Sequence, residues 1–322
     1  MADNYLEKRF NEVFRKPTSI DPETGFEEKS REAHHTGLPK TRLAVEARQI
    51  DLNDYTLFGE GPNGTSYNHN SDSGVMVKLY NASSPFGIIV NEYNFAKKVY
   101  DAGIPCPQTF DFVTDGKGRF GITFERIPGK RSFCTAMSRE PENFEKYSRE
   151  FAKFCRELHS IHVDTSLFPS IKDVDLQMLD ESPFFTEEEK VKVADFINKV
   201  PDSDIAHHGD LHYGNAIMTD RGNFFIDLGD FAYGHPYFDL GQVLLSSCYP
   251  YEEYIRYAFH IEPEDGVRFW HYFVKEYFGE DANINEVSEM LRPYAGLMSL
   301  LIERNMGQKY DRYHDLLVGV VL

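Results

Sequence analysis

The strongest chemical signal in this sequence lies in the stretch His208-Gly209-Asp210-Leu211-His212-Tyr213-Gly214-Asn215. Within it, Asp210 precedes Asn215 with four residues between them. An aspartate carboxylate can accept the proton of a hydroxyl nucleophile, and an asparagine carbonyl can bind Mg²⁺ without adding another charge. A second carboxylate, Asp227, follows at the end of a strand expected over Phe224-Phe225-Ile226-Asp227. Any one acidic residue of so acidic a chain is usually a surface group, but this ordered set indicates a site for Mg²⁺ and a hydroxyl.

A glycine-rich segment, Gly59-Glu60-Gly61-Pro62-Asn63-Gly64, lies upstream of this stretch, with expected strands on both sides. A dinucleotide-binding fingerprint needs a helix after its glycines. The context therefore favours a hairpin folded over nucleotide phosphates, as in kinases. Pro62 has no amide hydrogen, so the loop cannot use every backbone N–H as a donor. An ordinary glycine hairpin is the alternative interpretation.

Lys78 lies on the next expected strand, and Glu92 lies on a helix expected over about 86–101. Glu92 stands four residues after Ile88 and three before Phe95, so it lies on or beside the apolar stripe of that helix. A buried carboxylate needs a partner because an unpaired buried charge is costly, and Lys78 is the candidate. A lysine held by a helix glutamate is how kinases orient nucleotide phosphates. A solvated strand lysine and a glutamate at the rim of the helix are the alternatives.

The expected elements divide the chain into three parts. Residues 1–50 are expected to form a short amphipathic helix and a polar arm, whose role the sequence leaves open. Residues 51–127 are rich in strands and contain one helix, whereas residues 128–322 are mainly helical. In the helical part, Thr186 and Glu189 form a capping-box pattern that predicts the start of a helix. We therefore predict an α+β fold with a small antiparallel-sheet lobe and a larger helical lobe.

The composition excludes several classes of protein. The 322 residues include 34 Lys and Arg against 52 Asp and Glu, for a formal net charge of −18. This balance argues against nucleic-acid binding and against attachment to anionic membranes through a polybasic patch. Apolar runs are too short to span a bilayer, and the four cysteines form no Cys-x-x-Cys pair. With no signal-peptide pattern at the start, a cytoplasmic location is expected. The acidic balance serves solubility, or it attracts cations and amines.

The chain resembles the aminoglycoside phosphotransferase and choline kinase-like family, a branch of the protein-kinase-like fold that phosphorylates small molecules. The resemblance rests on the stretch 208–215, on Ile226-Asp227 and on Gly234-His235-Pro236-Tyr237-Phe238-Asp239-Leu240. It covers roughly residues 54–310. The resemblance implies a bilobal kinase-like fold and an activity that transfers phosphate from ATP with magnesium.

The resemblance implies a role for each matching residue. Lys78 and Glu92 would form the ion pair that orients the phosphates, and Asp210 would be the catalytic base. Asn215 and Asp227 would be the magnesium ligands. The nucleotide-binding residues would be Gly59, Gly61, Gly64, Lys78, Glu125 and Ile127, the last two in the connector whose backbone meets the adenine.

Two further residues would support the catalytic loop: His208 as a structural histidine, and Asp239 as a buried aspartate that braces the loop. The chain also departs from the family. It has Gly234-His235-Pro236 where the family often has Gly-Asp-Pro, which changes a charge but removes no phosphate-transfer group. Asp227 is followed by Leu228-Gly229-Asp230, and the short distance to Asp239 leaves no room for a long activation loop. This departure points away from protein substrates.

We therefore expect a small-molecule kinase that moves the γ-phosphate of ATP, with Mg²⁺, to a hydroxyl group. The acceptor could be an aminoglycoside, a choline-like amine or another metabolite, and the sequence does not select among them. A nucleotide-binding pseudokinase that regulates or scaffolds is the competing interpretation, and a protein kinase is a weaker one. We expect neither nucleic acid nor a membrane as a partner, and the oligomeric state and the preference for ATP or GTP stay open.

Overall fold

In the computed structural model, the described residues are 46–61, 64–249, 255–306 and 309–321. The predicted amphipathic helix and nearly all of the predicted polar arm lie outside them. The chain divides into two compact units, and each is described here by itself. Unit 1 comprises Met1–Lys130 and Phe224–Asp230, and unit 2 comprises Arg131–Asn223 and Phe231–Leu322. Within the described ranges, no helix combines the length and the apolar character needed to cross a membrane.

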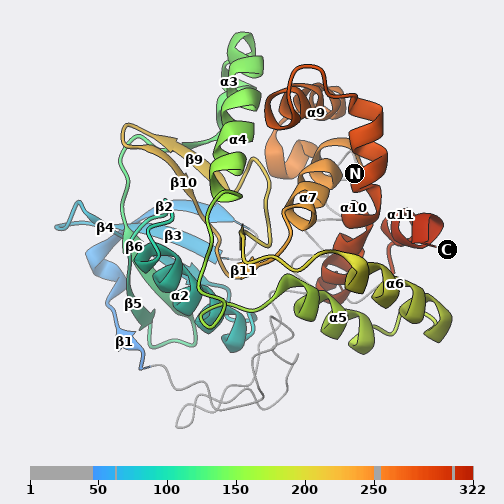
Figure 1. The fold of residues 1–322 in the computed structure, drawn as a ribbon. Coiled ribbons are helices and arrows are strands. Elements are labelled where there is room, and N and C mark those ends of the chain that lie inside the picture. The colour runs from blue at the N-terminus through green and yellow to red at the C-terminus, as the bar shows by residue number, and fades with distance from the viewer. Residues whose placement is uncertain (1–45, 62–63, 250–254, 307–308, 322) are drawn as a thin grey trace, which may run out of the picture. The chain divides into compact units, whose positions relative to one another are not determined.

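A six-stranded sheet forms the centre of unit 1 (Figure 1). Its strand order is β1-β5-β6-β4-β3-β2. Neighbouring strands are antiparallel, except that β1 pairs with β5 in parallel, so the sheet expected to be antiparallel is mixed at one edge. The strands are β1 (Arg48–Gln49), β2 (Tyr55–Gly61), β3 (Gly64–His69), β4 (Val75–Tyr80), β5 (Thr109–Thr114) and β6 (Phe120–Glu125).

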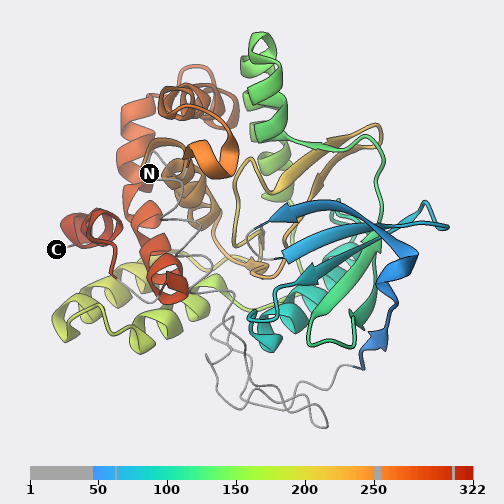
Figure 2. The ribbon, with the colours of Figure 1, turned by 180° about the vertical axis from the view of Figure 1, so that it is seen from behind.

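The alternation of side chains along β4 brings Lys78 toward a helix. Val77 and Leu79 are fully buried in one hydrophobic cluster, and Lys78 and Tyr80 point to the opposite face because successive strand residues alternate. Tyr80 packs there against apolar residues of helix α2 (Phe86–Asp101), which has the predicted bounds. Figures 1 and 2 show α2 against one face of the sheet. Lys78 therefore points to the face of the sheet that α2 covers.

Unit 2 is mainly helical, with an aromatic core. Phe151 packs against Phe269 and Phe273, which joins two of its helices. The capping box predicted at Thr186 and Glu189 is confirmed. The α-helices are α3 (Phe133–Arg139), α4 (Phe144–Leu158), α5 (Ile171–Glu181), α6 (Glu187–Lys199), α7 (Tyr237–Cys248), α9 (Pro263–Phe278), α10 (Ile284–Met306) and α11 (Asp311–Val321).

Short strands lie next to Asp210, Asn215 and Asp227 along the chain. In unit 2, β8 (Ala206–His207) pairs with β11 (Ala232–Tyr233) just before the stretch that holds Asp210. Asn215 directly precedes β9 (Ala216–Thr219), which pairs with β7 (Arg131–Ser132). The hairpin partner of β9 is β10 (Gly222–Phe225), and beyond it the chain continues through the segment of unit 1 that carries Asp227. Asp227 therefore belongs to unit 1 and Asp210 belongs to unit 2.

Candidate active site

Lys78 lies between two carboxylates in unit 1. Its Nζ is 3.0 Å from Oε1 and 3.3 Å from Oε2 of Glu92, and it also donates to Oδ1 of Asp227. Glu92 is buried, as its position beside the apolar stripe of the helix predicted. Lys78 is the cationic partner that a buried carboxylate requires. Burial opposes the charge on Lys78, but Asp227 and Glu92 together raise the pKa of its ammonium well above the ordinary value. Lys78 therefore remains protonated at neutral pH.

Asp227 has an unusual backbone conformation and lies beyond the end of β10. Its φ of +58° lies in the left-handed region, which aspartate tolerates better than most residues with a side chain. The strand expected to end at Asp227 ends instead at Phe225, so Asp227 stands two residues beyond it. Its side chain is 42% exposed, against 9% for that of Glu92. Asp227 is thus the carboxylate of the cluster that solvent or a ligand can reach.

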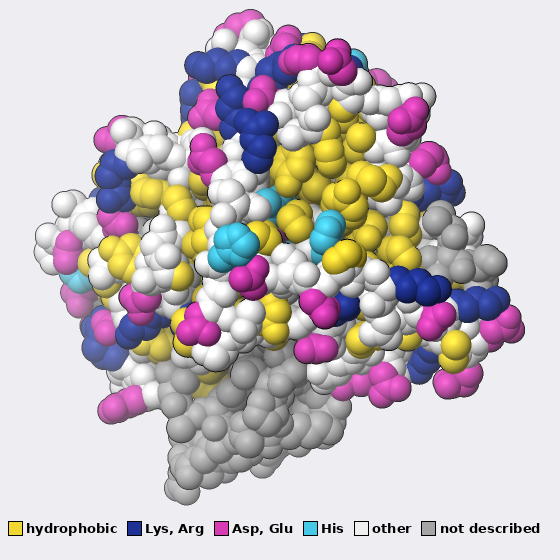
Figure 3. Space-filling model, viewed as in Figure 1, with side chains coloured by type: hydrophobic (Ala, Val, Ile, Leu, Met, Phe, Trp, Pro, Cys, Tyr) yellow, Lys and Arg dark blue, Asp and Glu magenta, His cyan; other side chains and the backbone are white. Residues whose placement is uncertain are grey.

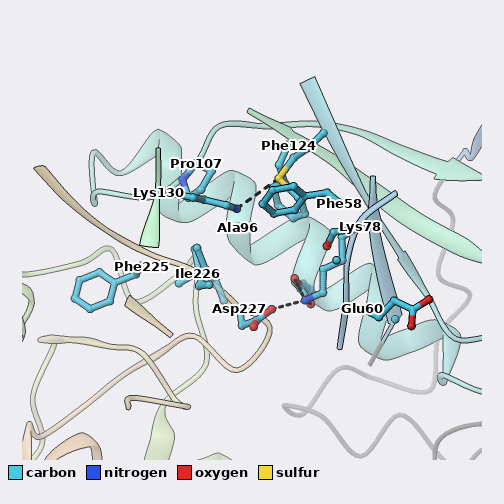
Figure 4. A pocket seen from close by; sticks show the side chains of 16 residues that line it. Phe58, Glu60, Lys78, Ala96, Pro107, Phe124, Lys130, Phe225, Ile226 and Asp227 are labelled. Carbon is cyan, nitrogen blue, oxygen red and sulfur yellow. Dashed lines mark hydrogen bonds and ion pairs between the residues drawn. The ribbon is translucent and has the colours of Figure 1, made fainter. Parts of the chain in front are cut away.

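The Lys78 cluster borders a cavity of about 320 Å³ in unit 1 (Figure 4). Its volume lies at the lower end of the range of about 300–1,000 Å³ that is usual for small-molecule sites. Away from the cluster the lining is largely apolar, from Phe58, Met76, Ala96, Pro107, Phe124, Phe225 and Ile226. An apolar lining beside a protonated lysine suits a ligand that has an apolar or aromatic part and an anionic part.

The predicted nucleotide-binding glycines Gly59 and Gly64 line this cavity. The third, Gly61, ends β2 and pairs with Gly64. A Cβ on Gly64 would lie 2.1 Å from the carbonyl oxygen of Leu79, which excludes any side chain there. Because β3 approaches β4 so closely here, position 64 requires glycine whether or not the hairpin binds phosphate.

The connector residues Glu125 and Ile127 do not line the cavity, although Phe124 before them does. The backbone N–H of Glu125 already donates to the carbonyl oxygen of Gln108 at 2.8 Å. Ile127 is buried, with 3% of its surface exposed. The cavity thus reaches the edge of the connector through Phe124.

Lys130 is a cavity residue that the sequence did not single out. Its Nζ points into the apolar region (Figure 4), 3.6 Å from Sδ of Met76 and 6.0 Å from the ring centre of Phe58. Burial lowers the pKa of this ammonium, and within the described residues no carboxylate forms an ion pair with it. The only signal in the sequence was its position directly after the turn Pro128-Gly129.

Asp210 in unit 2 is held on both of its carboxylate oxygens. Nδ2 of Asn215 donates to Oδ2 and to the backbone carbonyl oxygen of Asp210, each at 2.9 Å. Nε2 of Gln242 donates to Oδ1. His212 lies 3.7 Å from Oδ2. These contacts fix the carboxylate while leaving part of the side chain, 37%, exposed.

Asp239, on α7, is fully buried and contacts the backbone just before Asp210. Its carboxylate accepts the backbone N–H of His208 at 2.8 Å and that of Gly209 at 3.1 Å. Nε2 of His159 lies 3.1 Å away, and Nε2 of His207 lies 3.2 Å away. Burial by itself would raise the pKa of Asp239, but His207 and His159 lower it far below the ordinary value. A charged Asp239 therefore anchors the start of this loop.

The two predicted magnesium ligands have the right chemistry for a hard cation. Because Nδ2 of Asn215 is committed to Asp210, the side-chain oxygen of Asn215 is the atom left to accept a ligand. Asp227 offers an exposed carboxylate. Mg²⁺ is usually held by one or two such protein oxygens together with substrate phosphates and water. Each of the two residues therefore carries an oxygen donor of the kind that Mg²⁺ binds.

A comparison with protein families gives one match that covers most of the chain. Residues 55–270 match the family described as the phosphotransferase enzyme family. The matched range contains the glycine-rich hairpin, the Lys78 cluster and the loop that carries Asp210. No curated protein sequence matches the chain.

Several solved structures are similar to this chain in fold. A thermostable mutant of aminoglycoside phosphotransferase APH(4)-Ia, in a ternary complex with ADP and hygromycin B, has a TM-score of 0.52 at 11% identity, covering 82% of this chain and 93% of that chain. The gentamicin complex of APH(2'')-IIa has a TM-score of 0.50 at 17% identity, covering 84% of this chain and 90% of that one. At these identities the likeness concerns the fold, and the predicted class of a strand-rich N-terminal lobe with a helical C-terminal lobe is confirmed.

Proposed function

The chain belongs to the phosphotransferase enzyme family, as its motifs indicated, and on that premise we propose that it transfers the γ-phosphate of ATP, with Mg²⁺, to a hydroxyl group of a small molecule. The observation that carries this proposal is the cluster of Lys78, Glu92 and Asp227 at the border of an apolar cavity. One carboxylate would suffice to neutralise a structural lysine. The second leaves the cluster with a net charge of about −1, which a bound cation would balance.

The nucleotide would bind in the cavity of unit 1. Its base would lie in the apolar region between Phe58 and Met76, and its phosphates would extend toward Lys78. The ammonium of Lys78 is a compact point charge, and the pairing with Glu92 holds it at the cavity wall. Asp227 and Asn215 would hold Mg²⁺, which when bound neutralises the charge of the phosphates.

Asp210 would act as the catalytic base. A carboxylate in this role orients the acceptor hydroxyl and accepts its proton as the new O–P bond forms. Asp210 is suited to this because Asn215 and Gln242 hold its two oxygens, so that little of its orientation has to be fixed during the reaction. The barrier would be lowered mainly through positioning and neutralisation of charge.

The acceptor would be a hydroxylated small molecule. The structures similar in fold bind hygromycin B and gentamicin, which supports aminoglycosides as one class to test. The net charge of −18 is a weaker guide. Figure 3 shows acidic side chains in small separate groups, and hydrophobic side chains gathered over the part of unit 2 that holds α7 and α9. Among the described side chains visible on this face, no broad acidic surface marks a binding site for an amine.

The test is phosphate transfer by the purified full chain to a panel of aminoglycosides, amino alcohols and sugars, followed as ADP release. We expect Asp210→Asn to lower turnover by about 10²–10⁴-fold, the usual contribution of a general base, while a thermal-shift assay still detects Mg²⁺-dependent nucleotide binding. The control is Asp195→Asn, an exposed aspartate of α6 that pairs with Lys199. Unchanged turnover in Asp210→Asn would refute the mechanism.

The same assay separates the proposal from a pseudokinase. A pseudokinase would bind nucleotide without transferring phosphate to any acceptor or to water, so no ADP would form. With labelled ATP and a lysate, a protein kinase would label proteins more strongly than any small molecule of the panel. Either result would overturn the proposed function.

A further inference from the structure

Gln242 makes two contacts that fix the orientation of its side-chain amide. Oε1 accepts the backbone N–H of Leu211 at 2.7 Å, and Nε2 donates to Oδ1 of Asp210. A backbone N–H can only donate, so the amide oxygen must face Leu211 and the NH₂ group must face Asp210. A flipped amide would place donor against donor on one side and oxygen against carboxylate on the other. Gln242 is 5% exposed, so water does not replace either contact.

Gln242 shares one face of α7 with Asp239. The two residues are three positions apart, which places them on neighbouring turns of the same helix face. Asp239 accepts the N–H groups of His208 and Gly209, and Gln242 takes the next N–H, that of Leu211, together with the Asp210 carboxylate. This face of α7 therefore contacts four consecutive residues of the loop.

The helix that carries Gln242, α7, packs closely against α10 in unit 2. Gly241, its neighbour, lies so close to α10 that a Cβ would be 2.5 Å from the backbone carbonyl carbon of Tyr294. The helix cannot shift toward α10, and Leu240 and Val243 on either side are fully buried. A side chain on such an element holds its partner more accurately than one on a loop.

We propose that Gln242 is a positioning residue of the transfer reaction: it donates to Oδ1 of Asp210 and holds that carboxylate in the orientation in which it meets the acceptor hydroxyl. This inference rests on the proposed function, because it assigns Asp210 the role of base. Asn215 secures the other oxygen, so the carboxylate is held from two elements, α7 and the start of β9. Removing either donor lets the side chain of Asp210 rotate about its Cα–Cβ bond.

Gln242→Glu separates the positioning role from the structural one. Glutamate keeps the size of the side chain and an oxygen for the N–H of Leu211, but it loses the donor to Asp210 and sets a like charge beside it. We expect kcat to fall by about 10–100-fold, as for a small misplacement of a reacting group, with the KM for nucleotide within about twofold of the parent, because the nucleotide cavity lies in unit 1. Gln177→Glu, the same change at an exposed position of α5, is the control and should leave both constants unchanged.

Gln242→Met removes both contacts at similar volume. We expect it to lose kcat as Gln242→Glu does, and also to lower the melting temperature because the buried N–H of Leu211 loses its acceptor. If Gln242→Glu keeps the parent kcat, or if its loss of kcat only follows a loss of folded protein, the positioning role is wrong.

A double variant shows whether Gln242 acts through Asp210. In the Asp210→Asn background, adding Gln242→Glu should leave the residual rate unchanged, since the group that it positions is gone. A further loss of the same size as in the parent would overturn the inference. The two proposals also fail differently: a fully active Asp210→Asn refutes the proposed function, whereas an inactive Asp210→Asn beside a fully active Gln242→Glu refutes only the role of Gln242.

Discussion

Replacing Asp239 by asparagine should destabilise the protein strongly, because this carboxylate accepts several hydrogen bonds that an amide cannot. Both of its oxygens face donors: Oδ2 accepts from the N–H of His208 and lies near Nε2 of His159, and Oδ1 accepts from the N–H of Gly209 and lies near Nε2 of His207. In asparagine one oxygen becomes NH₂. At least one buried backbone N–H then faces another donor, whichever way the amide turns.

The magnitude follows from the contacts that are lost. One hydrogen bond to a charged acceptor contributes about 1.5–3 kcal/mol, and a buried donor left without an acceptor costs about 1–3 kcal/mol. We therefore expect Asp239→Asn to lower the free energy of unfolding by about 3–5 kcal/mol, a large part of the roughly 5–15 kcal/mol that holds a native protein folded. The melting temperature should fall by on the order of 10 °C.

The assay is urea unfolding at pH 7 together with thermal melting. The control is Asp202→Asn, whose carboxylate is 94% exposed and pairs with Lys172, and which should change stability by less than about 1 kcal/mol. The lowered pKa of Asp239 means that its charged form stabilises the protein above about pH 4, its unfolded pKa, and that this contribution is lost as the pH falls toward the folded pKa. The difference between parent and variant should therefore shrink in acid. A variant within about 1 kcal/mol of the parent at pH 7 would show that this reasoning is wrong.

Two further predictions concern the cavity of unit 1. Among the described residues, Glu92→Gln leaves Lys78 with Asp227 as its one carboxylate partner. We expect the kcat/KM for nucleotide to fall by about 10–100-fold, the equivalent of one charged hydrogen bond. Steady-state kinetics at varied nucleotide concentration measure this ratio, and an unchanged value would contradict the role of the pair. Lys130→Met removes the ammonium from the apolar region at little change in volume, and we expect the dissociation constant for nucleotide to change by several-fold while the kcat stays close to the parent value; calorimetric titration measures it, and identical binding would show that Lys130 lies outside the nucleotide site.

Local elements were largely predictable from the sequence. The helix expected over about 86–101 is observed as α2, and the strand expected at Lys78 is observed as β4. These features depend on residues within a few positions of one another, which periodicity and turn chemistry report directly. The pairing of Lys78 with Glu92 also followed, since a carboxylate beside an apolar stripe requires a nearby cation.

The partners of the site residues were harder to predict. Gln242 stands in an apolar helix just beyond the stretch 234–240 and outside every motif singled out in the sequence, and its contact with Asp210 spans 32 positions. The entry of Lys130 into the cavity depends on where the chain turns after β6, and the assignment of segment 224–230 to unit 1 depends on its packing. Such long-range contacts leave no periodic pattern in the sequence from which they could be predicted.

The sequence by itself determined which chemical groups this protein carries and in what order: a glycine-rich hairpin, a lysine and a glutamate, then an aspartate, an asparagine and a second aspartate. The glycines, Asp210 and Asn215 are visible because they belong to short motifs with fixed spacing, whereas Lys78 and Glu92 were identified from an expected strand and from the apolar stripe of an expected helix. Only the tertiary structure decided which groups meet, as Lys78 meets Asp227 across 149 positions and Asp210 meets Gln242. The physical reason is that such contacts are set by how whole strands and helices pack, and packing depends on many buried side chains at once.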